Sequence, residues 1–127
     1  MIKRILLVDD EAAVLFAYSR LLQRDHCQVD AVDSKEGSLA LLGRNKYDVA
    51  ILDLRLGGDS CEEGFEILQH IKEVQPETVI IMITAHGNQD IQDRAYRLGA
   101  HHYLEKPVST SLIREALVVS GVLPPTG

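Results

Sequence analysis

The sequence predicts an α/β fold, a doubly wound parallel five-stranded sheet with helices on both faces, in three α/β/α layers. Five short apolar runs rich in β-branched residues alternate with stretches of helical spacing, which implies right-handed β–α–β crossovers. The runs 5–8, 49–52 and 79–83 are almost continuously apolar. This pattern is typical of central strands that are buried on both sides.

The second and fifth apolar runs are more polar than the others, so they are expected at the edges of the sheet. The expected strands are 4–9, 27–32, 48–53, 78–84 and 102–106.

The helices between them follow from spacing and from end signals. The first has apolar residues at helical spacing, namely Val14, Leu15, Tyr18, Leu21 and Leu22. Ser34 is placed to cap the second helix and Gly43 to end it, while Pro76 stops the third and Gly99 ends the fourth. The expected helices are 12–25, 35–43, 62–74, 89–98 and 109–119.

Composition narrows the class of protein. A chain of 127 residues with 46% hydrophobic and 25% charged residues is typical of one globular domain, expected here over 1–121, with 122–127 as a tail or the start of a linker. The net charge of -6 argues against nucleic acid as a direct partner. No run is long enough to span a membrane, no signal peptide is visible, and Cys27 and Cys61 have no partnering motif. A cytoplasmic location is expected.

Polar residues stand where the expected strands end. Asp9 and Asp10 close the first strand, Asp53 the third, Thr84 the fourth and Lys106 the fifth. Ligands of open parallel sheets bind outside the carboxyl ends of the strands, which lie along one edge. These five side chains are therefore expected to converge, although they span most of the chain.

Such a set points to phosphoryl chemistry. Two carboxylates about 4 Å apart repel by roughly 4 kcal/mol at an effective dielectric of 20, unless a cation lies between them. Oxygen ligands of this kind select Mg²⁺, which shares its coordination shell with phosphate oxygens. Lys106 and Thr84 could each hold a phosphoryl oxygen, and Asp53 is the natural nucleophile. The set predicts phosphoryl transfer onto the protein itself.

Four motifs, "LLVDDE", "ILDL", "ITAHG" and "YLEKP", appear in this order at the expected strand ends. Together they resemble the response-regulator receiver domain of two-component signalling over nearly the whole chain. The resemblance implies a flavodoxin-like (βα)₅ sheet of order 2-1-3-4-5. It also implies a phosphorelay signalling domain that turns over no external substrate. A sensor histidine kinase or histidine phosphotransfer protein would be the donor, and an output domain or protein the target.

The resemblance also implies a phosphoacceptor and a metal site. Asp53 would accept the phosphoryl group. Asp10 and Asp53 would ligate Mg²⁺ directly, Asp9 directly or through water, and the Arg55 carbonyl would complete the protein ligands. Mn²⁺ would serve as a substitute.

The switch implied by the resemblance lies beside this site. Thr84 and Lys106 would hold the phosphoryl oxygens, Thr84 would move toward them, and Tyr103 would swing inward. The face formed by the fourth helix, fifth strand and fifth helix would then repack, and it is a candidate homodimer surface. Pro107 suggests a cis peptide bond after Lys106.

The loop after Asp53 departs from the family pattern. The segment 56–64 is about three residues longer than usual and more acidic, and Gly64 is the plausible counterpart of a family glycine. Arg55 and His86 lie near the expected water path, at positions that tune the lifetime of the phosphate in similar domains. Acidic residues of the loop, such as Asp59, are expected to be solvated.

Three alternatives stay open. Asp9 and Asp10 could merely cap the first helix, where Glu11 is expected to place negative charge, but this leaves Asp53 and Lys106 unexplained. A haloacid-dehalogenase-type Mg²⁺ phosphatase would also use a strand-end aspartate, but that class needs a second aspartate where this chain has Arg55. A receiver-like module that works by contacts alone, without phosphorylation, is the third alternative.

Overall fold

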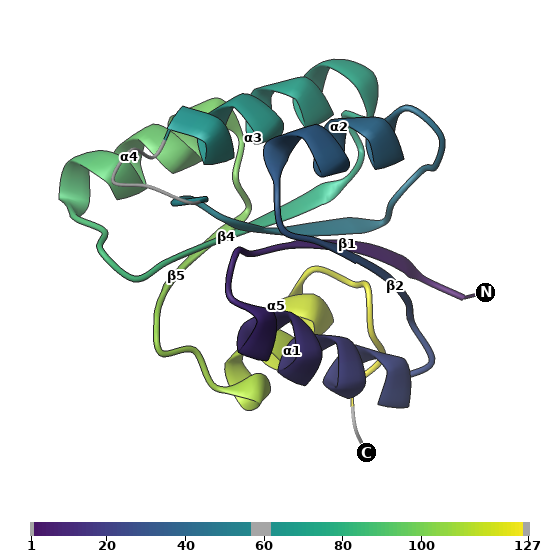
Figure 1. The fold of residues 1–127 in the computed structure, drawn as a ribbon. Coiled ribbons are helices and arrows are strands. Elements are labelled where there is room, and N and C mark those ends of the chain that lie inside the picture. The colour runs from purple at the N-terminus through teal and green to yellow at the C-terminus, as the bar shows by residue number, and fades with distance from the viewer. Residues whose placement is uncertain (1, 57–61, 126–127) are drawn as a thin grey trace.

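The computed structural model describes residues 2–56 and 62–125. A five-stranded parallel sheet forms its middle layer, in the order β2-β1-β3-β4-β5. Helices α2, α3 and α4 cover one face, and α1 and α5 cover the other (Figure 1). The predicted flavodoxin-like fold and strand order are confirmed. In chain order the elements are β1 (Arg4–Val8), α1 (Ala12–Arg24), β2 (Gln28–Val32), α2 (Lys35–Leu42), β3 (Val49–Asp53), α3 (Glu62–Val74), β4 (Val79–Thr84), α4 (Gln89–Leu98), β5 (His102–Glu105) and α5 (Thr110–Val119).

The three central strands are buried on both faces. Their side chains alternate between two hydrophobic clusters, one under α2–α4 and the other under α1 and α5. In β1, for example, Leu6 and Val8 belong to the first cluster, and Ile5 and Leu7 to the second. Burying apolar side chains on both faces explains why these runs show no polar alternation. The more polar β2 and β5 are the edge strands, as predicted.

The helix ends follow mostly from local side-chain chemistry. The Gly37 N–H donates to the Ser34 hydroxyl at 3.1 Å, which caps α2 as predicted. Gly99 ends α4 in the left-handed conformation, with φ 112°. Gly43 also ends a helix, but its φ of -74° is right-handed, so α2 ends without the glycine-specific turn. Other observed boundaries lie within one residue of the predicted ones.

The segment after α5 packs onto the domain. Val122 and Leu123 were expected in a tail, yet they are 8% and 5% exposed and belong to the hydrophobic cluster under α1 and α5. Their N–H groups both donate to the Leu117 carbonyl, at 2.9 Å and 3.2 Å. The packed unit therefore extends past residue 121. No described helix is both long and apolar enough to cross a membrane.

Parts of two expectations lie outside the described residues. Residues 57–61 include most of the acidic loop, with Asp59 and Cys61, and residues 126–127 end the expected tail. The start of α3 is described. An ideal Cβ on Gly64 would lie 2.6 Å from the Leu54 Cα, so only glycine permits this close approach of α3 to the chain that leaves β3.

Candidate functional site

Three aspartates meet at the carboxyl ends of β1 and β3. Asp9 and Asp10 follow β1, and Asp53 is the last residue of β3, the strand that pairs with β1. One carboxylate oxygen from each of the three lies within 4.8 Å of the other two. Asp9 and Asp53 are only 3% and 4% exposed, whereas Asp10 faces solvent. The predicted convergence of these acids is therefore present in the structure.

The Lys106 ammonium lies among the carboxylates. Its Nζ is 3.0 Å from Asp9 Oδ2, 3.3 Å from Asp53 Oδ2 and 2.8 Å from Glu11 Oε1. Burial disfavours the charged ammonium, but hydrogen bonds to Glu11 and Asp9 outweigh it and raise the pKa of Lys106. The lysine therefore remains protonated and can serve as a fixed positive charge.

One ammonium does not compensate all of these acids. Burial and the neighbouring Asp9 charge raise the pKa of Asp53 above its ordinary value, although Lys106 and the Arg55 N–H act in the opposite direction. The Arg55 N–H donates to Asp53 Oδ1 at 3.2 Å. The positive charge of Lys106 therefore does not offset the burial of ionised Asp53 and its repulsion by Asp9, which is the electrostatic condition that a bound divalent cation relieves.

Thr84 completes this edge of the sheet. It is the last residue of β4 and is fully buried, and its hydroxyl oxygen accepts the His86 N–H at 3.3 Å. The Lys106 N–H donates to the Thr84 carbonyl at 2.8 Å, which ties the end of β4 to Lys106. The Lys106–Pro107 peptide bond is cis. Tyr103 lies on β5 and is 8% exposed, so its ring is already buried in this structure.

Arg55 connects two loops at the mouth of the site. Its guanidinium NH2 group donates to the His86 carbonyl at 3.1 Å, which joins the chain after β3 to the loop after β4. The His86 side chain itself is exposed. The backbone N–H of Arg55 contacts Asp53, and that of His86 contacts Thr84. The expected place of Arg55 and His86 beside a water path stays a prediction.

Two features of the site had no assigned role in the sequence analysis. Glu11 was expected only to place charge at a helix N-terminus, but it makes no side-chain cap and instead accepts a hydrogen bond from Lys106, 95 residues away. Asp9 Oδ1 accepts the Glu11 N–H at 2.9 Å, so Asp9 supports the start of α1 as well as contacting Lys106. Gly87 is the second feature, because its missing side chain leaves room for Tyr103. Only glycine's small size hinted at this in the sequence.

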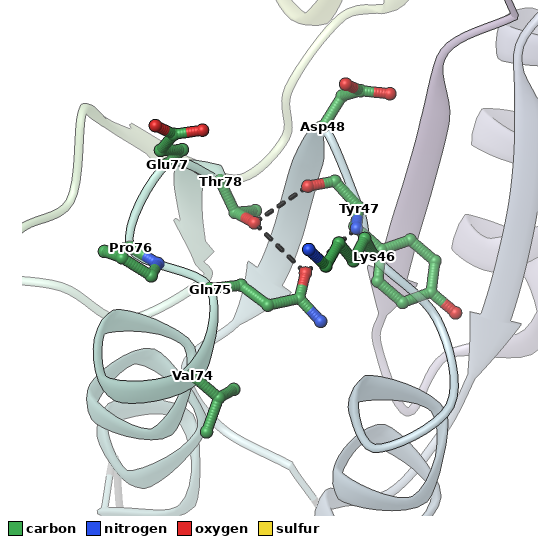
Figure 2. A pocket seen from close by; sticks show the side chains of 8 residues that line it. All are labelled: Lys46, Tyr47, Asp48, Val74, Gln75, Pro76, Glu77 and Thr78. Atoms are coloured by element: carbon green, nitrogen blue, oxygen red, sulfur yellow. Dashed lines mark hydrogen bonds between the residues drawn. The ribbon is translucent and has the colours of Figure 1, made fainter.

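A pocket at the amino ends of β3 and β4 is a competing candidate (Figure 2). Three of its lining residues, Tyr47, Gln75 and Thr78, are hydrogen-bonded to one another. The Gln75 Oε1 accepts the Tyr47 N–H at 2.9 Å, and the Thr78 hydroxyl donates to the Tyr47 carbonyl at 2.8 Å. The Gln75 Nε2 donates to the Asn45 and Leu42 carbonyls. Since these groups are already paired, the network is best explained as a structural link between strand and helix ends.

Comparison with known proteins agrees with the geometry at the carboxyl edge. Residues 5–118 match the family described as the response regulator receiver domain. The chain belongs to this family. It is therefore a signalling domain and not a classical enzyme, and neither the phosphatase nor the phosphorylation-independent alternative gains support.

The relatives of this receiver domain are regulators. It is 37% identical over 113 residues to the alginate biosynthesis transcriptional regulatory protein AlgB of Pseudomonas aeruginosa, covering 89% of this chain and 24% of AlgB. It is 30% identical to the photosynthetic apparatus regulatory protein RegA of Rhodobacter capsulatus, covering 97% of this chain and 66% of RegA. The chain thus spans about a quarter of AlgB and about two thirds of RegA.

Solved structures show the same fold. A response regulator from Burkholderia pseudomallei, with a phosphorylated aspartic acid, a calcium ion and citrate, has a TM-score of 0.83 and 30% identity, covering 94% of this chain and 70% of that one. The receiver domain of the putative Luxo repressor protein from Vibrio parahaemolyticus also has a TM-score of 0.83, with 26% identity over 94% of this chain and 90% of that one.

Proposed function

We propose that Asp53 is the phosphoacceptor of this receiver domain. The observation that carries the proposal is the position of its buried carboxylate, in contact with Lys106 and grouped with Asp9 and Asp10 at the carboxyl edge of the sheet. A carboxylate oxygen of Asp53 attacks the phosphorus of a phosphohistidine. The P–O bond forms as the P–N bond breaks, and the imidazole leaves with the electron pair of that bond.

The donor set fits a Mg²⁺ ion, with Mn²⁺ as a substitute. Hard carboxylate oxygens grouped within 4.8 Å, with too little compensating positive charge, are the chemistry that this ion requires. Asp10 and Asp53 would bind it directly, Asp9 directly or through water, and the Arg55 carbonyl would be the fourth protein ligand. When bound, the ion neutralises negative charge on the carboxylates and on the phosphoryl oxygens.

Lys106 and Thr84 hold the phosphoryl oxygens in this proposal. Lys106 already contacts Asp53, and Thr84 is the last residue of β4, the strand that pairs with β3. Movement of Thr84 toward the phosphoryl group is coupled to the inward position of Tyr103, which alters the surface of α4, β5 and α5. Arg55 and His86 border the water path and tune the lifetime of the aspartyl phosphate.

A sensor histidine kinase or a histidine phosphotransfer protein supplies the phosphoryl group, and an output domain or separate protein reads the altered surface. Response regulators signal in this way in general. We further propose a cytoplasmic location, no direct contact with nucleic acid or membrane, and homodimerisation through the α4–β5–α5 surface. The receiver unit is assigned to residues 1–121 together with the packed residues Val122 and Leu123.

Acetyl phosphate tests the central proposal. With Mg²⁺ present, intact-mass measurement is expected to show a gain of one phosphoryl group that hydroxylamine removes, as it does for acyl phosphates. The Asp53→Ala variant is expected to show no gain. Asp48→Asn is the matched control, because Asp48 precedes the amino end of the same strand, and it should be phosphorylated normally.

The other outcomes favour the alternatives. Repeated turnover of a phosphate ester would support a phosphatase. No adduct on the wild-type chain, with either acetyl phosphate or a phosphorylated histidine donor, would support a module that works by contacts alone. An adduct retained in Asp53→Ala would place the acceptor elsewhere.

A further inference from the structure

Gly87 lies in the loop between β4 and α4, against the ring of Tyr103. An ideal Cβ built on Gly87 would lie 1.7 Å from the Tyr103 hydroxyl oxygen and 2.9 Å from the Tyr103 Cζ. The same Cβ would lie 2.9 Å from the Thr84 Cγ2. Real Cβ atoms essentially never come within 3.0 Å of a heavy atom from a residue that is not a chain neighbour. The present position of the Tyr103 ring therefore requires glycine at this point.

Backbone conformation does not explain the glycine. Among the described glycines, only Gly99 and Gly121 have positive φ, at 112° and 80°. Gly87 thus has a backbone that alanine can adopt, and its special property is the space above its Cα. Gly43 differs, because a Cβ there would meet nothing closer than 3.6 Å.

A clash at Gly87 could be relieved mainly by the tyrosine. Thr84 is fully buried at the end of β4, so its methyl group has no free space to enter. The Tyr103 ring is rigid, so its hydroxyl end cannot retreat unless the whole ring turns about χ1. Tyr103 belongs to the edge strand β5, and no strand of the described residues lies on its outer side. Rotation toward solvent is therefore the available movement.

We propose that Gly87 is a positioning residue that sets the inward position of Tyr103. The Tyr103 hydroxyl occupies the space that a side chain on Gly87 would fill. This space lies next to Thr84, and Gly87 comes one residue before Asn88, which caps α4. Any side chain at position 87 displaces the ring outward. The link between this position and signalling rests on the proposed function, whereas the position of the ring itself does not.

The test is photo-CIDNP of the tyrosines in the unmodified, metal-free chain, with a flavin dye that polarises exposed rings. The chain contains internal controls, because Tyr96 is 44% exposed while Tyr18 and Tyr47 are 7% and 5% exposed. In wild type, Tyr96 should be polarised and the other three tyrosines should not. In Gly87→Ala, the Tyr103 signal is expected to rise from background to the level of Tyr96. Gly43→Ala should leave Tyr103 silent.

A silent Tyr103 in a folded Gly87→Ala protein overturns the proposal. If Gly87→Ala does not fold, the double variant Gly87→Ala/Tyr103→Ala decides, since it removes the ring that the new methyl group meets. Recovery of a folded double variant supports a clash specific to Tyr103, and failure to recover overturns it. Because no phosphoryl group enters these measurements, their result is independent of whether Asp53 is phosphorylated.

Discussion

At the residue scale, the site brings more negative than positive charge together at one edge of the sheet. Lys106 contacts Asp9, Glu11 and Asp53, so one ammonium faces three carboxylates, and Asp10 belongs to the same group of aspartates. Asp9 and Asp53 are almost fully buried, which weakens solvent screening of their repulsion. Repulsion among these carboxylates therefore lowers the stability of the metal-free domain, and the same carboxylates are the groups proposed to bind a cation and a phosphoryl group.

Asp53→Asn is expected to stabilise the metal-free domain. The pKa of Asp53 is raised by burial and by Asp9, so its contribution to stability falls as the pH rises above its ordinary pKa of 3.8. At neutral pH, the neutral amide should increase the free energy of unfolding by about 1–2 kcal/mol. Urea unfolding in EDTA measures this change. A lower free energy of unfolding for Asp53→Asn than for wild type would contradict it.

Magnesium is expected to make the wild type more stable than Asp53→Asn, which reverses the order of stability expected without metal. Ligand binding to the folded state raises stability with the logarithm of ligand concentration relative to Kd, so Mg²⁺ should raise the unfolding temperature of the wild type much more than that of Asp53→Asn, which binds it more weakly. Asp48→Asn is the control, and it should respond to Mg²⁺ as the wild type does. Equal shifts in all three proteins would show that the ion binds elsewhere.

At the element scale, the approach of α3 to β3 depends on Gly64. A methyl group there would lie 2.6 Å from the Leu54 Cα and 2.7 Å from its carbonyl oxygen, and both are backbone atoms that cannot turn aside. Gly64→Ala is expected to lower the free energy of unfolding by about 1–3 kcal/mol, the usual cost of overpacking. Gly43→Ala is the matched control, with φ -74° and open space, and should be neutral or stabilising. Chemical denaturation of both variants checks the contrast.

The junction of β4 and β5 is expected to be sensitive to acid. His101 Nδ1 accepts the Ile80 N–H at 3.0 Å, which requires the unprotonated imidazole. Burial, then Lys72 and His102, lower the pKa of His101 below 6.5. The stabilisation is therefore complete above the ordinary pKa and is lost as the pH falls below it through the folded-state pKa.

His101→Asn tests this pH dependence, because an amide oxygen can accept the same N–H but does not titrate. Between pH 7 and pH 5 the wild type should lose about 0.5–1 kcal/mol more unfolding free energy than His101→Asn, the value of one hydrogen bond. Parallel pH profiles of the two proteins would assign no role to His101.

At the scale of the whole molecule, the sheet separates two hydrophobic clusters, and the chain after α5 closes one of them. Leu123 is 5% exposed within the cluster under α1 and α5, whereas Leu112 on α5 is 46% exposed. Leu123→Ala is expected to lower the free energy of unfolding by about 2–3 kcal/mol, because it leaves a cavity. Leu112→Ala should change it by less than about 0.5 kcal/mol. If the two substitutions cost the same, Leu123 is not part of the core.

The sequence by itself determined the type of sheet and the location of the site. Apolar runs and helical spacing are local properties of the chain, so they predicted each element to within about one residue. Strand polarity then required residues at the ends of parallel strands to share one edge, which brought Asp53 and Lys106 together across 53 positions of the chain.

Only the tertiary structure decided which side chains occupy the space around that edge. The bond between Lys106 and Glu11 and the contact between Tyr103 and Gly87 join residues from different segments of the chain. Leu123 is buried although it lies beyond the expected end of the domain. From the sequence alone, Glu11 is equally compatible with a charge at a helix end, Gly87 with an ordinary loop glycine, and Leu123 with a tail. Side-chain rotamers and packing between separate elements select among these roles, and neither is a local property of the chain.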